Sequence, residues 1–205
     1  PICEGYGLSE TSPSASCNPT TSTQFTGNIG VPLPSTFMKL LDDEGHEVTE
    51  LGQPGEIAIK GPQVMAGYWQ RPDETARSMT ADGYFKSGDI GIRDAHGFFK
   101  IIDRKKDMIL VSGFNVYPND VEETVSLCPG VLECAAVGVP DEKTGEAVKL
   151  VIVKKDPSLT ELAVREYCKA NMTGYKQPKL VEFKKELPKT AVGKILRREL
   201  RDAPQ

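Results

Sequence analysis

The chain has 205 residues, of which 39% are hydrophobic and 26% charged, so it can bury one large core or two small ones. This composition excludes a disordered chain, a collagen-like repeat and a disulfide scaffold, and the formal net charge of −4 argues against a nucleic-acid binder. No apolar stretch approaches the roughly 18 residues of a membrane span, and the first twenty residues lack the features of a secretory signal.

The first half of the chain predicts a small, mostly β domain. Residues 9–28 are rich in Ser and Thr without apolar periodicity, so we expect an extended loop there. Four short runs that alternate or are apolar then predict strands, and the turn clusters between them favour a barrel or a curled sheet. They are FMKLLD at 37–42, EIAIK at 56–60, YFKSGDI at 84–90 and FFKIID at 98–103. A short helix is expected from Pro72, which acids follow in the first turn.

After Asp103 the sequence becomes basic and its rhythm changes, so we place a domain boundary there. The second half predicts an α+β domain of about 100 residues, with β-rich segments at 131–139, 147–154 and 180–184. A helix at 119–128 would bury Val121, Val125 and Cys128. Ser158 and Glu161 are spaced as a capping box for a helix that ends near Met172. That helix would turn Leu159, Ala163, Tyr167 and Ala170 inward, and a last basic helix is expected near 193–202.

The cysteines and histidines do not indicate a metal or nucleophile site. The five cysteines have no C-x-x-C spacing, and His46 and His96 lie in turn-like contexts. We therefore expect neither a zinc site nor a Cys-His or Ser-His-Asp pairing. Small buried residues in a reducing cytosol are the simplest interpretation of the cysteines, which are Cys3, Cys17, Cys128, Cys134 and Cys168.

Two glycine-containing segments of the first half are candidates for nucleotide chemistry. In YGLSE, residues 6–10, a hydroxyl beside a carboxylate suits Mg²⁺ with a phosphate nearby, although a Tyr-Gly turn before a helix cap has the same pattern. In Ser87-Gly88-Asp89, the acid can accept hydrogen bonds from vicinal sugar hydroxyls, although an ordinary Gly-Asp turn is the simpler reading.

Two charged segments are candidates in the second half. The run from Asp103 to Asp107 is either solvated surface or, at the expected domain boundary, a hinge or a phosphate contact. In PKTAVGKILRREL, residues 188–200, Gly193 permits a tight turn and delivers Lys194 to an expected helix start, where the helix dipole disfavours a cation. Residues 176–205 hold nine Lys or Arg against four acids, which fits a solvated tail or a segment that meets an anionic substrate.

These segments, taken in order, resemble the adenylate-forming ligases: acyl-CoA synthetases, luciferases and the adenylation domains of peptide synthetases. YGLSE resembles Y-G-x-T-E, GEIAIKGPQVMAGYW resembles the G-E…G-P…G-Y strand pair, and YFKSGDI resembles the T-G-D segment. IIDRKKDMILVSGFNVYP resembles the D-R-x-K-x-x-I hinge, and PKTAVGKILRREL resembles P-K-T-x-x-G-K-I-x-R-R. The stretch from residue 61 to 122 is especially similar to bacterial long-chain fatty-acid CoA ligases, which form an acyl-adenylate and then acyl-CoA.

The resemblance implies roles for single residues of the first half. Gly5, Tyr6 and Gly7 would line the adenine site, while Ser9 would approach the α-phosphate and Glu10 would bind Mg²⁺.

Further roles are implied around the domain boundary and beyond it. Asp89 and Arg104 would hold the ribose hydroxyls, Lys106 would be the hinge and Lys194 the adenylation lysine. Ser112, Gly113 and Phe114 would lie on the loop that faces CoA. The cofactors and small-molecule substrates implied are ATP, Mg²⁺, CoA and a fatty acid.

The chain also departs from the family pattern. Ser9 and Ser87 stand where Thr is commoner, and Leu110 stands where luciferase-like members have Lys. The Ser/Thr/Gly-rich phosphate loop that ends in Pro-Lys-Gly is absent, and so is the upstream region that forms the acyl pocket.

We therefore expect the C-terminal part of a longer ligase of α+β class. Residues 1–103 would be the end of the large N-domain with its β-barrel-like subdomain, and residues 104–205 a small mobile C-terminal domain. The 205 residues alone would be inactive. The parent would be a cytoplasmic protein that binds no nucleic acid. Peripheral contact with the inner membrane is an alternative that the sequence leaves open. Alternatives are an aryl or medium-chain acid CoA ligase, or a non-catalytic interaction module.

Overall fold

The computed structural model describes residues 2–191 and 193–201, and the chain divides into two compact units, Pro1–Lys105 and Lys106–Gln205. Both sheets and helices are present, so the expectation of an α+β fold is confirmed. Among the described residues, no helix is long and apolar enough to cross a membrane.

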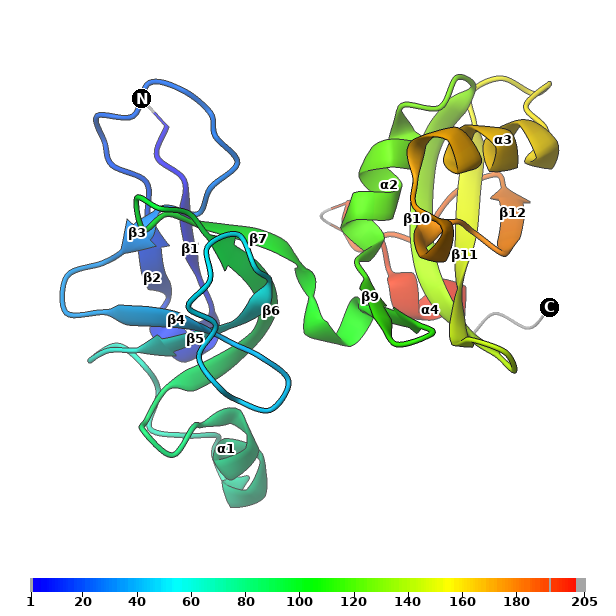
Figure 1. The fold of residues 1–205 in the computed structure, drawn as a ribbon. Helices are drawn as coiled ribbons and strands as arrows, with labels where there is room; N and C mark the ends of the chain where they lie inside the picture. The colour runs from blue at the N-terminus through cyan, green and yellow to red at the C-terminus, as the bar shows by residue number, and fades with distance from the viewer. Residues whose placement is uncertain (1, 192, 202–205) are drawn as a thin grey trace. The chain divides into compact units, whose positions relative to one another are not determined.

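The first unit contains two antiparallel sheets (Figure 1). The smaller sheet has the order β1-β2-β3, and the larger one follows chain order, β4-β5-β6-β7. The four strands expected from alternating apolar residues are confirmed as the larger sheet. The bounds are β1 Gly5–Gly7, β2 Ser14–Cys17, β3 Val31–Pro32, β4 Phe37–Leu41, β5 Gly55–Lys60, β6 Phe85–Arg93 and β7 Phe99–Arg104, with a 3-10 turn, η1, at Ser9–Thr11 and a helix, α1, at Pro72–Ser78.

The larger sheet is curled but open. In the described part of the chain, β4 and β7 are its two edges and do not pair, so the sheet closes no barrel. The backbone of Phe99 exchanges hydrogen bonds of 2.8 and 3.0 Å with Ile29 and Gly30, which brings β7 beside the smaller sheet. Tyr6, Ile57 and Phe99 share one buried cluster, so the two sheets enclose a common core.

The expectation of one loop over residues 9–28 is wrong in its first half. Residues 9–11 form η1 and residues 14–17 form β2, because Thr11 supplies hydrogen bonds that composition does not reveal. Its hydroxyl accepts from the N–H of Leu8 at 2.9 Å and donates to the carbonyl of Pro13 at 2.6 Å. The turn that results directs the chain back along β1.

The second unit is a mixed sheet covered by helices. Its order is β10-β11-β8-β9, with β12 parallel to β11 on a branch. The apolar segments 131–139, 147–154 and 180–184 are confirmed as strands. The bounds are β8 Ile109–Val111, β9 Phe114–Val116, β10 Val131–Asp141, β11 Gly145–Lys154, β12 Leu180–Lys184, α2 Pro118–Ser126, α3 Glu161–Asn171 and α4 Arg197–Arg201, with 3-10 turns η2 at Lys105–Asp107 and η3 at Gly174–Lys176.

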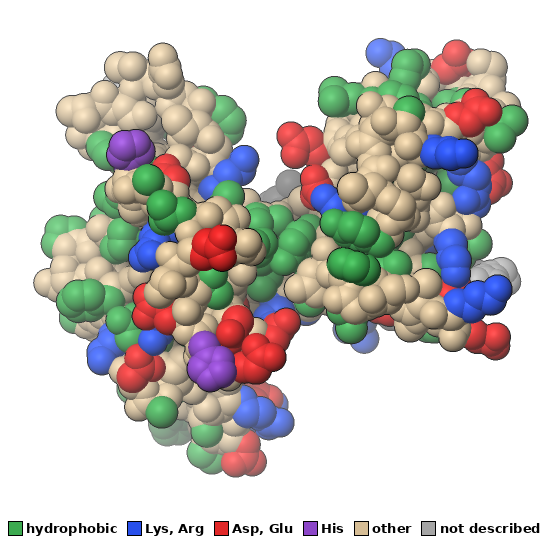
Figure 2. Space-filling view, in the orientation of Figure 1, with side chains coloured by type: hydrophobic (Ala, Val, Ile, Leu, Met, Phe, Trp, Pro, Cys, Tyr) green, Lys and Arg blue, Asp and Glu red, His purple; other side chains and the backbone are tan. Residues whose placement is uncertain are grey.

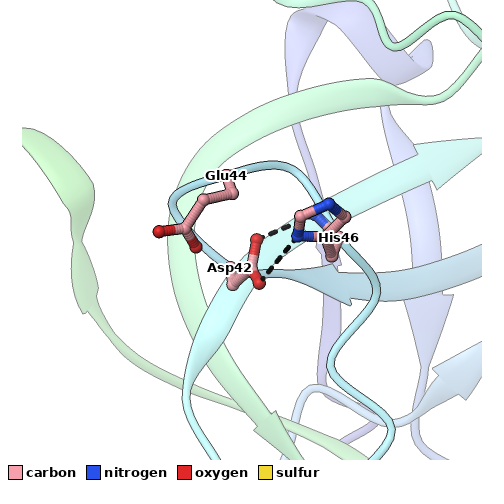
Figure 3. Close-up of side chains that lie close together, drawn as sticks. All are labelled: Asp42, Glu44 and His46. Atoms are coloured by element: carbon pink, nitrogen blue, oxygen red, sulfur yellow. Dashed lines mark hydrogen bonds and ion pairs between the residues drawn. The ribbon is translucent and has the colours of Figure 1, made fainter.

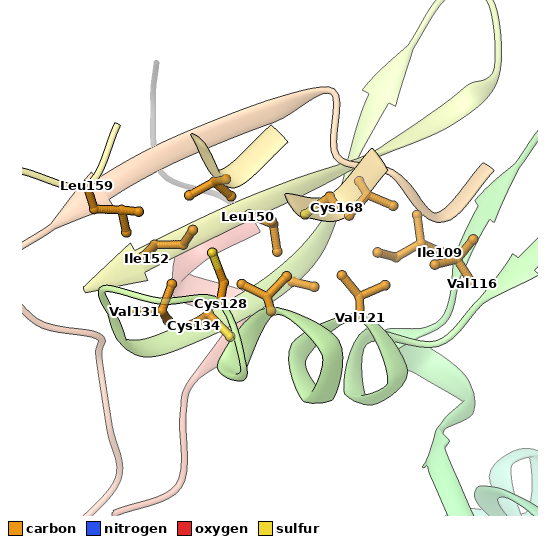
Figure 4. Packing of buried hydrophobic residues seen from close by; sticks show 14 of the residues in the cluster. Ile109, Val116, Val121, Cys128, Val131, Cys134, Leu150, Ile152, Leu159 and Cys168 are labelled. Carbon is orange, nitrogen blue, oxygen red and sulfur yellow. The ribbon is translucent and has the colours of Figure 1, made fainter. Parts of the chain in front are cut away.

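β10 and β11 are apolar on both faces because both faces are covered. Ala136, Leu150 and Ile152 pack in the core beneath α2 and α3 (Figure 4), whereas Ala135 and Val151 pack with Leu200 of α4. Successive residues of a strand point to opposite faces, so two covered faces require a nearly continuous apolar run. Each fully buried Ile or Leu contributes about 1.5–3 kcal/mol to folding.

The helix α3 differs from its expected boundary and face. Its N-cap is Thr160, whose side chain accepts from the N–H of Ala163, while the hydroxyl of Ser158 bonds to Asp156 instead. The capping box of Ser158 and Glu161 is therefore wrong. The buried side chains of α3 are Val164 and Cys168, whereas the expected Ala163 and Ala170 are exposed and Tyr167 is half-buried.

The expected burial of the cysteines is confirmed for three of the five. Cys128 follows the end of α2 and is buried with Cys134 and Cys168. Cys3 is exposed and Cys17 half-buried, and their Sγ atoms lie 3.2 Å apart, between the residues before β1 and the end of β2. Hydrophobic side chains also reach the surface of each unit, as the face drawn in Figure 2 shows. Trp69 and Phe25, with exposures of 87% and 83%, are among these residues.

Candidate functional site

A cavity of about 820 Å³ lies in the first unit. Its wall combines the turn after β1, the edge of β5 and β6, the segment around α1 and the end of β7. Of the expected nucleotide and metal residues, Gly7, Ser9, Glu10 and Arg104 line it. The cavity wall also includes Glu56, Tyr68, Ser87, Gly88 and Lys105.

Gly7 is required by the close approach of two backbone segments. A Cβ at this position would lie 1.6 Å from the carbonyl oxygen of Pro13, a distance that no side chain can occupy. The absence of a side chain therefore lets β1 turn directly into η1. As a result Ser9 and Glu10 stand together at the cavity, with Ser9 exposed and Glu10 half-buried.

Asp89 and Arg104 face each other on adjacent strands, as a sugar-binding pair would need. They are Cα partners in the β6–β7 register, and Nε of Arg104 lies 2.9 Å from Oδ1 of Asp89. The Arg104 side chain is 46% exposed and lines the cavity, whereas Asp89 is buried behind the wall. Asp89 therefore orients Arg104 toward the cavity.

Tyr6 lies behind the same wall and is buried. Its hydroxyl donates to Oδ2 of Asp89 at 2.7 Å. Burial raises the pKa of the Tyr6 phenol, so the hydroxyl stays protonated and can donate. Gly5 precedes it on β1 and is exposed, and neither residue is among those lining the cavity.

Two residues that sequence reasoning missed hold the site together. Glu56 of β5 is buried, and its carboxylate accepts from the N–H of Gly88 at 3.1 Å and from Nζ of Lys105 at 3.0 Å. Gly88 has a φ of +74°, which only glycine adopts easily, and the β5–β6 register shifts beside it, so Glu56 holds a bulge of β6 before Asp89. Glu56 stands in the GEIAIKGPQVMAGYW motif, but its partners are 32 and 49 residues away in sequence, so the motif could not reveal these contacts.

Tyr68 is the second missed residue. Its hydroxyl donates to Oε1 of Glu10 at 2.9 Å, and both side chains line the cavity. Burial and the hydrogen bond to Glu10 raise the pKa of Tyr68, so this phenol also stays neutral. One oxygen of Glu10 is thus engaged and the other is left for a ligand.

The expected CoA-loop residues form a tight hairpin turn in the second unit. Val111 of β8 pairs with Phe114 of β9, which leaves Ser112 and Gly113 as the turn, with φ of 51° and 83°. Both positive values are those of the turn that best fits the twist of a two-residue hairpin. The Phe114 ring is 55% exposed and stacks on Tyr175, with ring centroids 4.8 Å apart.

Lys194 does not begin a helix, so that expectation is wrong. It lies in an exposed loop closed by a bridge between Lys189 and Ile195, and α4 starts only at Arg197. The backbone N–H of Lys194 donates to the hydroxyl of Thr190 at 3.1 Å. Because Lys194 is outside the helix, its ammonium does not oppose the helix dipole.

Two ion pairs fix the ends of this loop. Lys189 lies 2.7 Å from Oε2 of Glu133 on one side. On the other side, the guanidinium of Arg197 makes two contacts with the carboxylate of Glu122, with Nη2 2.7 Å from Oε2 and Nε 3.0 Å from Oε1. The loop is therefore short and anchored at both ends, while the Lys194 side chain stays exposed. Lys106, the expected hinge, is the first residue of the second unit.

A cluster with metal-ligand atoms lies elsewhere, in the exposed turn after β4 (Figure 3). Ligand atoms of Asp42, Glu44 and His46 lie within 4.8 Å of one another. The N–H of His46 donates to Oδ1 of Asp42 at 2.8 Å, and its Nδ1 lies 3.5 Å from Oδ2. These contacts belong to the turn itself and account for the closeness of Asp42 and His46.

Comparison with known families matches both ends of the chain. Residues 1–69 match the family described as AMP-binding enzyme, and residues 120–194 match the AMP-binding enzyme C-terminal domain. The chain belongs to the AMP-binding enzymes. The resemblance to adenylate-forming ligases is thereby confirmed.

Two known proteins and one solved structure are similar to this AMP-binding chain over nearly its whole length. It is 59% identical over 98% of its length to a long-chain-fatty-acid–CoA ligase of Escherichia coli O6:H1, of which it spans 36%. It is 41% identical over 97% of its length to a feruloyl-CoA synthase of Amycolatopsis, of which it spans 40%. Among solved structures, ATP-bound MatB from Rhodopseudomonas palustris matches with a TM-score of 0.90 at 35% identity, over 98% of this chain and 40% of that one.

Proposed function

We propose that this chain is the C-terminal part of an ATP-dependent long-chain fatty-acid–CoA ligase. The observation that carries the proposal is the 59% identity to the E. coli ligase, which extends over 98% of the chain. The parent would join a fatty acid to ATP as an acyl-adenylate, release pyrophosphate and transfer the acyl group to CoA. Residues 1–103 would be the end of its large domain, and residues 104–205 its small mobile domain with Lys106 as the hinge.

The cavity of the first unit would hold the nucleotide. Arg104, oriented by Asp89, would donate to the ribose hydroxyls, and Gly5, Tyr6 and Gly7 would shape the adenine side. The Ser9 hydroxyl would approach the α-phosphate. Fixed donors around a phosphate hold the reactants in line, which is a large part of catalysis in phosphoryl chemistry.

Glu10 fits the role of a magnesium ligand. One oxygen of its carboxylate accepts from Tyr68, which leaves the other for a ligand, and Ser9 lines the cavity beside it. The donor set is therefore oxygen only, as Mg²⁺ prefers. When bound, Mg²⁺ would neutralise negative charge on the phosphates. Glu10 would hold the ion.

In the second unit, Lys194 would neutralise charge that develops on the reacting carboxylate and α-phosphate. An exposed lysine on a short, anchored loop suits this role, because the ammonium needs reach while the backbone needs a fixed place. Ser112, Gly113 and Phe114 would contact CoA from the hairpin turn. The parent would be cytoplasmic and act on small molecules, with peripheral contact to the inner membrane as an additional proposal.

A substrate panel on the full-length protein that carries this chain tests the proposal. Acyl-CoA formation from ATP and CoA should be fastest with long-chain fatty acids. Preference for ferulate would favour the aryl-acid alternative, which the 41% identity to feruloyl-CoA synthase supports. The 205 residues alone should catalyse no fatty-acid-dependent ATP–pyrophosphate exchange, and detectable exchange would overturn that part of the proposal.

A further inference from the structure

Tyr68 reaches the carboxylate of Glu10 from a different part of the fold. The two residues are 58 positions apart, and the hydroxyl of Tyr68 donates to Oε1 of Glu10 at 2.9 Å. Both lie on the wall of the same cavity, so the contact is at the site and not behind it.

Hydrogen bonds hold the backbone just before Tyr68 and at Tyr68 itself. Before it, the N–H of Met65 donates to the carbonyl oxygen of Glu10 itself at 2.8 Å. At Tyr68, the backbone N–H donates to the hydroxyl of Thr75 at 2.9 Å, and that hydroxyl donates to the backbone carbonyl of Arg71 at 3.0 Å. The segment is thus tied to Glu10 and to α1.

The neighbouring glycine makes this placement specific. Gly67 has a φ of +153°, and a Cβ there would lie 2.8 Å from Cγ2 of Thr75. A side chain at this position would push the segment away from α1 and would move Tyr68 with it. The direction of the phenol toward Glu10 is therefore set by the backbone.

A neutral phenol on one carboxylate oxygen has a defined effect on the other. Oε1 of Glu10 accepts the hydrogen bond from Tyr68, which uses one of its lone pairs, so Oε2 is the oxygen better able to coordinate a cation. The plane of the carboxylate is fixed at the same time. Hydrogen-bonding partners of metal ligands orient those ligands and tune their affinity.

We propose that Tyr68 is a positioning residue, which turns Glu10 so that one carboxylate oxygen faces the divalent cation that accompanies ATP. This inference rests on the proposed function. The GEIAIKGPQVMAGYW motif includes Tyr68 but gives it no task, because its partner comes from the turn after β1.

The experiment compares Tyr68→Phe with Tyr84→Phe in the full-length protein. Tyr84 is a matched control, since its ring packs beside Lys39 and Lys60 outside the cavity wall. Free Mn²⁺ is measured by electron paramagnetic resonance in the presence of protein and a non-hydrolysable ATP analogue. In parallel, ATP–pyrophosphate exchange is followed as a function of Mg²⁺ concentration.

Tyr68→Phe should weaken Mn²⁺ binding about tenfold and raise the half-saturating Mg²⁺ concentration by a similar factor. At saturating Mg²⁺ its kcat should recover to within about twofold of the unchanged protein, because the carboxylate itself remains. Tyr84→Phe should change neither quantity. Unchanged Mn²⁺ binding in Tyr68→Phe, or a lower kcat that no Mg²⁺ concentration restores, would overturn the inference.

Failure of the proposed function has a different outcome. The unchanged protein would then show no fatty-acid-dependent exchange at any Mg²⁺ concentration. The Mn²⁺ measurement would still decide whether Tyr68 affects the cation site, because it needs no turnover. Thermal unfolding of Tyr68→Phe provides the check on folding, and a melting temperature close to that of Tyr84→Phe assigns the binding change to the site.

Discussion

The phenol of Tyr6 and the carboxylate of Asp89, 83 residues apart in sequence, form a buried hydrogen bond of 2.7 Å that joins the two sheets of the first unit. The other carboxylate oxygen of Asp89 pairs with Arg104. Asp89 is therefore a structural link, and changes at this residue should affect folding as well as the proposed binding of ribose.

Tyr6→Phe should destabilise the first unit by about 1.5–3 kcal/mol, since it removes a hydrogen bond to a buried charged group. Urea unfolding followed by the fluorescence of Trp69, the single tryptophan of the chain and a residue of the same unit, measures this. Tyr84→Phe makes the same chemical change away from Asp89 and should leave the midpoint nearly unchanged. Equal midpoints for the two variants would show that the Tyr6 bond adds no stability.

The first unit should lose stability at alkaline pH through Tyr6. Burial raises the folded-state pKa of Tyr6 above its unfolded value of about 10, so its contribution is complete below that pH and is lost as the pH rises beyond it. The slope from this one group approaches about 1.4 kcal/mol per pH unit. Urea titrations from about pH 9 to about pH 11 should give a shallower decline for Tyr6→Phe. A decline of equal steepness would assign the effect to other groups.

Local sequence patterns were sufficient for most of the strands, and long-range contacts explain what they missed. Alternating or apolar runs predicted β4 to β7, because successive side chains of a strand point to opposite faces and one face of this sheet is buried. The predicted inner face of α3 is wrong, because packing against the rest of the unit buries Val164 and Cys168. Glu56 and Tyr68 both stand in the GEIAIKGPQVMAGYW motif, but their contacts could not be predicted, since their partners come from other strands and turns.

Alkylation should distinguish the exposed cysteine from the buried ones. Burial raises the pKa of Cys134 to about 12 and that of Cys168 to about 11, so few thiolates form there and reagents have no access. Iodoacetamide should label Cys3 first in the folded chain, as mass spectrometry of peptides will show. The hydrogen bond to Cys17 also raises the pKa of Cys3, so Cys17→Ala should accelerate its labelling. Labelling of Cys168 as fast as that of Cys3 would contradict the described core.

Arg197 should be needed to hold α4 and the Lys194 loop against α2. Both it and Glu122 are 16% exposed, so Arg197→Ala leaves a carboxylate largely buried and should cost the second unit about 2–4 kcal/mol. The N–H of Ala136 also donates to Glu122, at 2.8 Å, and hydrogen exchange at Ala136 should therefore rise. Lys185→Ala, at an exposed position, is the control and should leave that amide protected. Unchanged exchange at Ala136 in Arg197→Ala would mean that Glu122 keeps its place without the arginine.

Lys194→Ala in the full-length protein should separate the two half-reactions of the proposed ligase. Acyl-adenylate formation, followed as ATP–pyrophosphate exchange, should fall by about two to three orders of magnitude, because a charge that stabilises the transition state is removed. Transfer to CoA from supplied acyl-adenylate should persist, since the Ser112–Phe114 turn is untouched. Folding should be unaffected, because the Lys194 side chain is exposed and the loop is closed by backbone and Thr190 contacts. Lys185→Ala again serves as the matched lysine control, and equal loss of both steps in Lys194→Ala would contradict a role confined to adenylation.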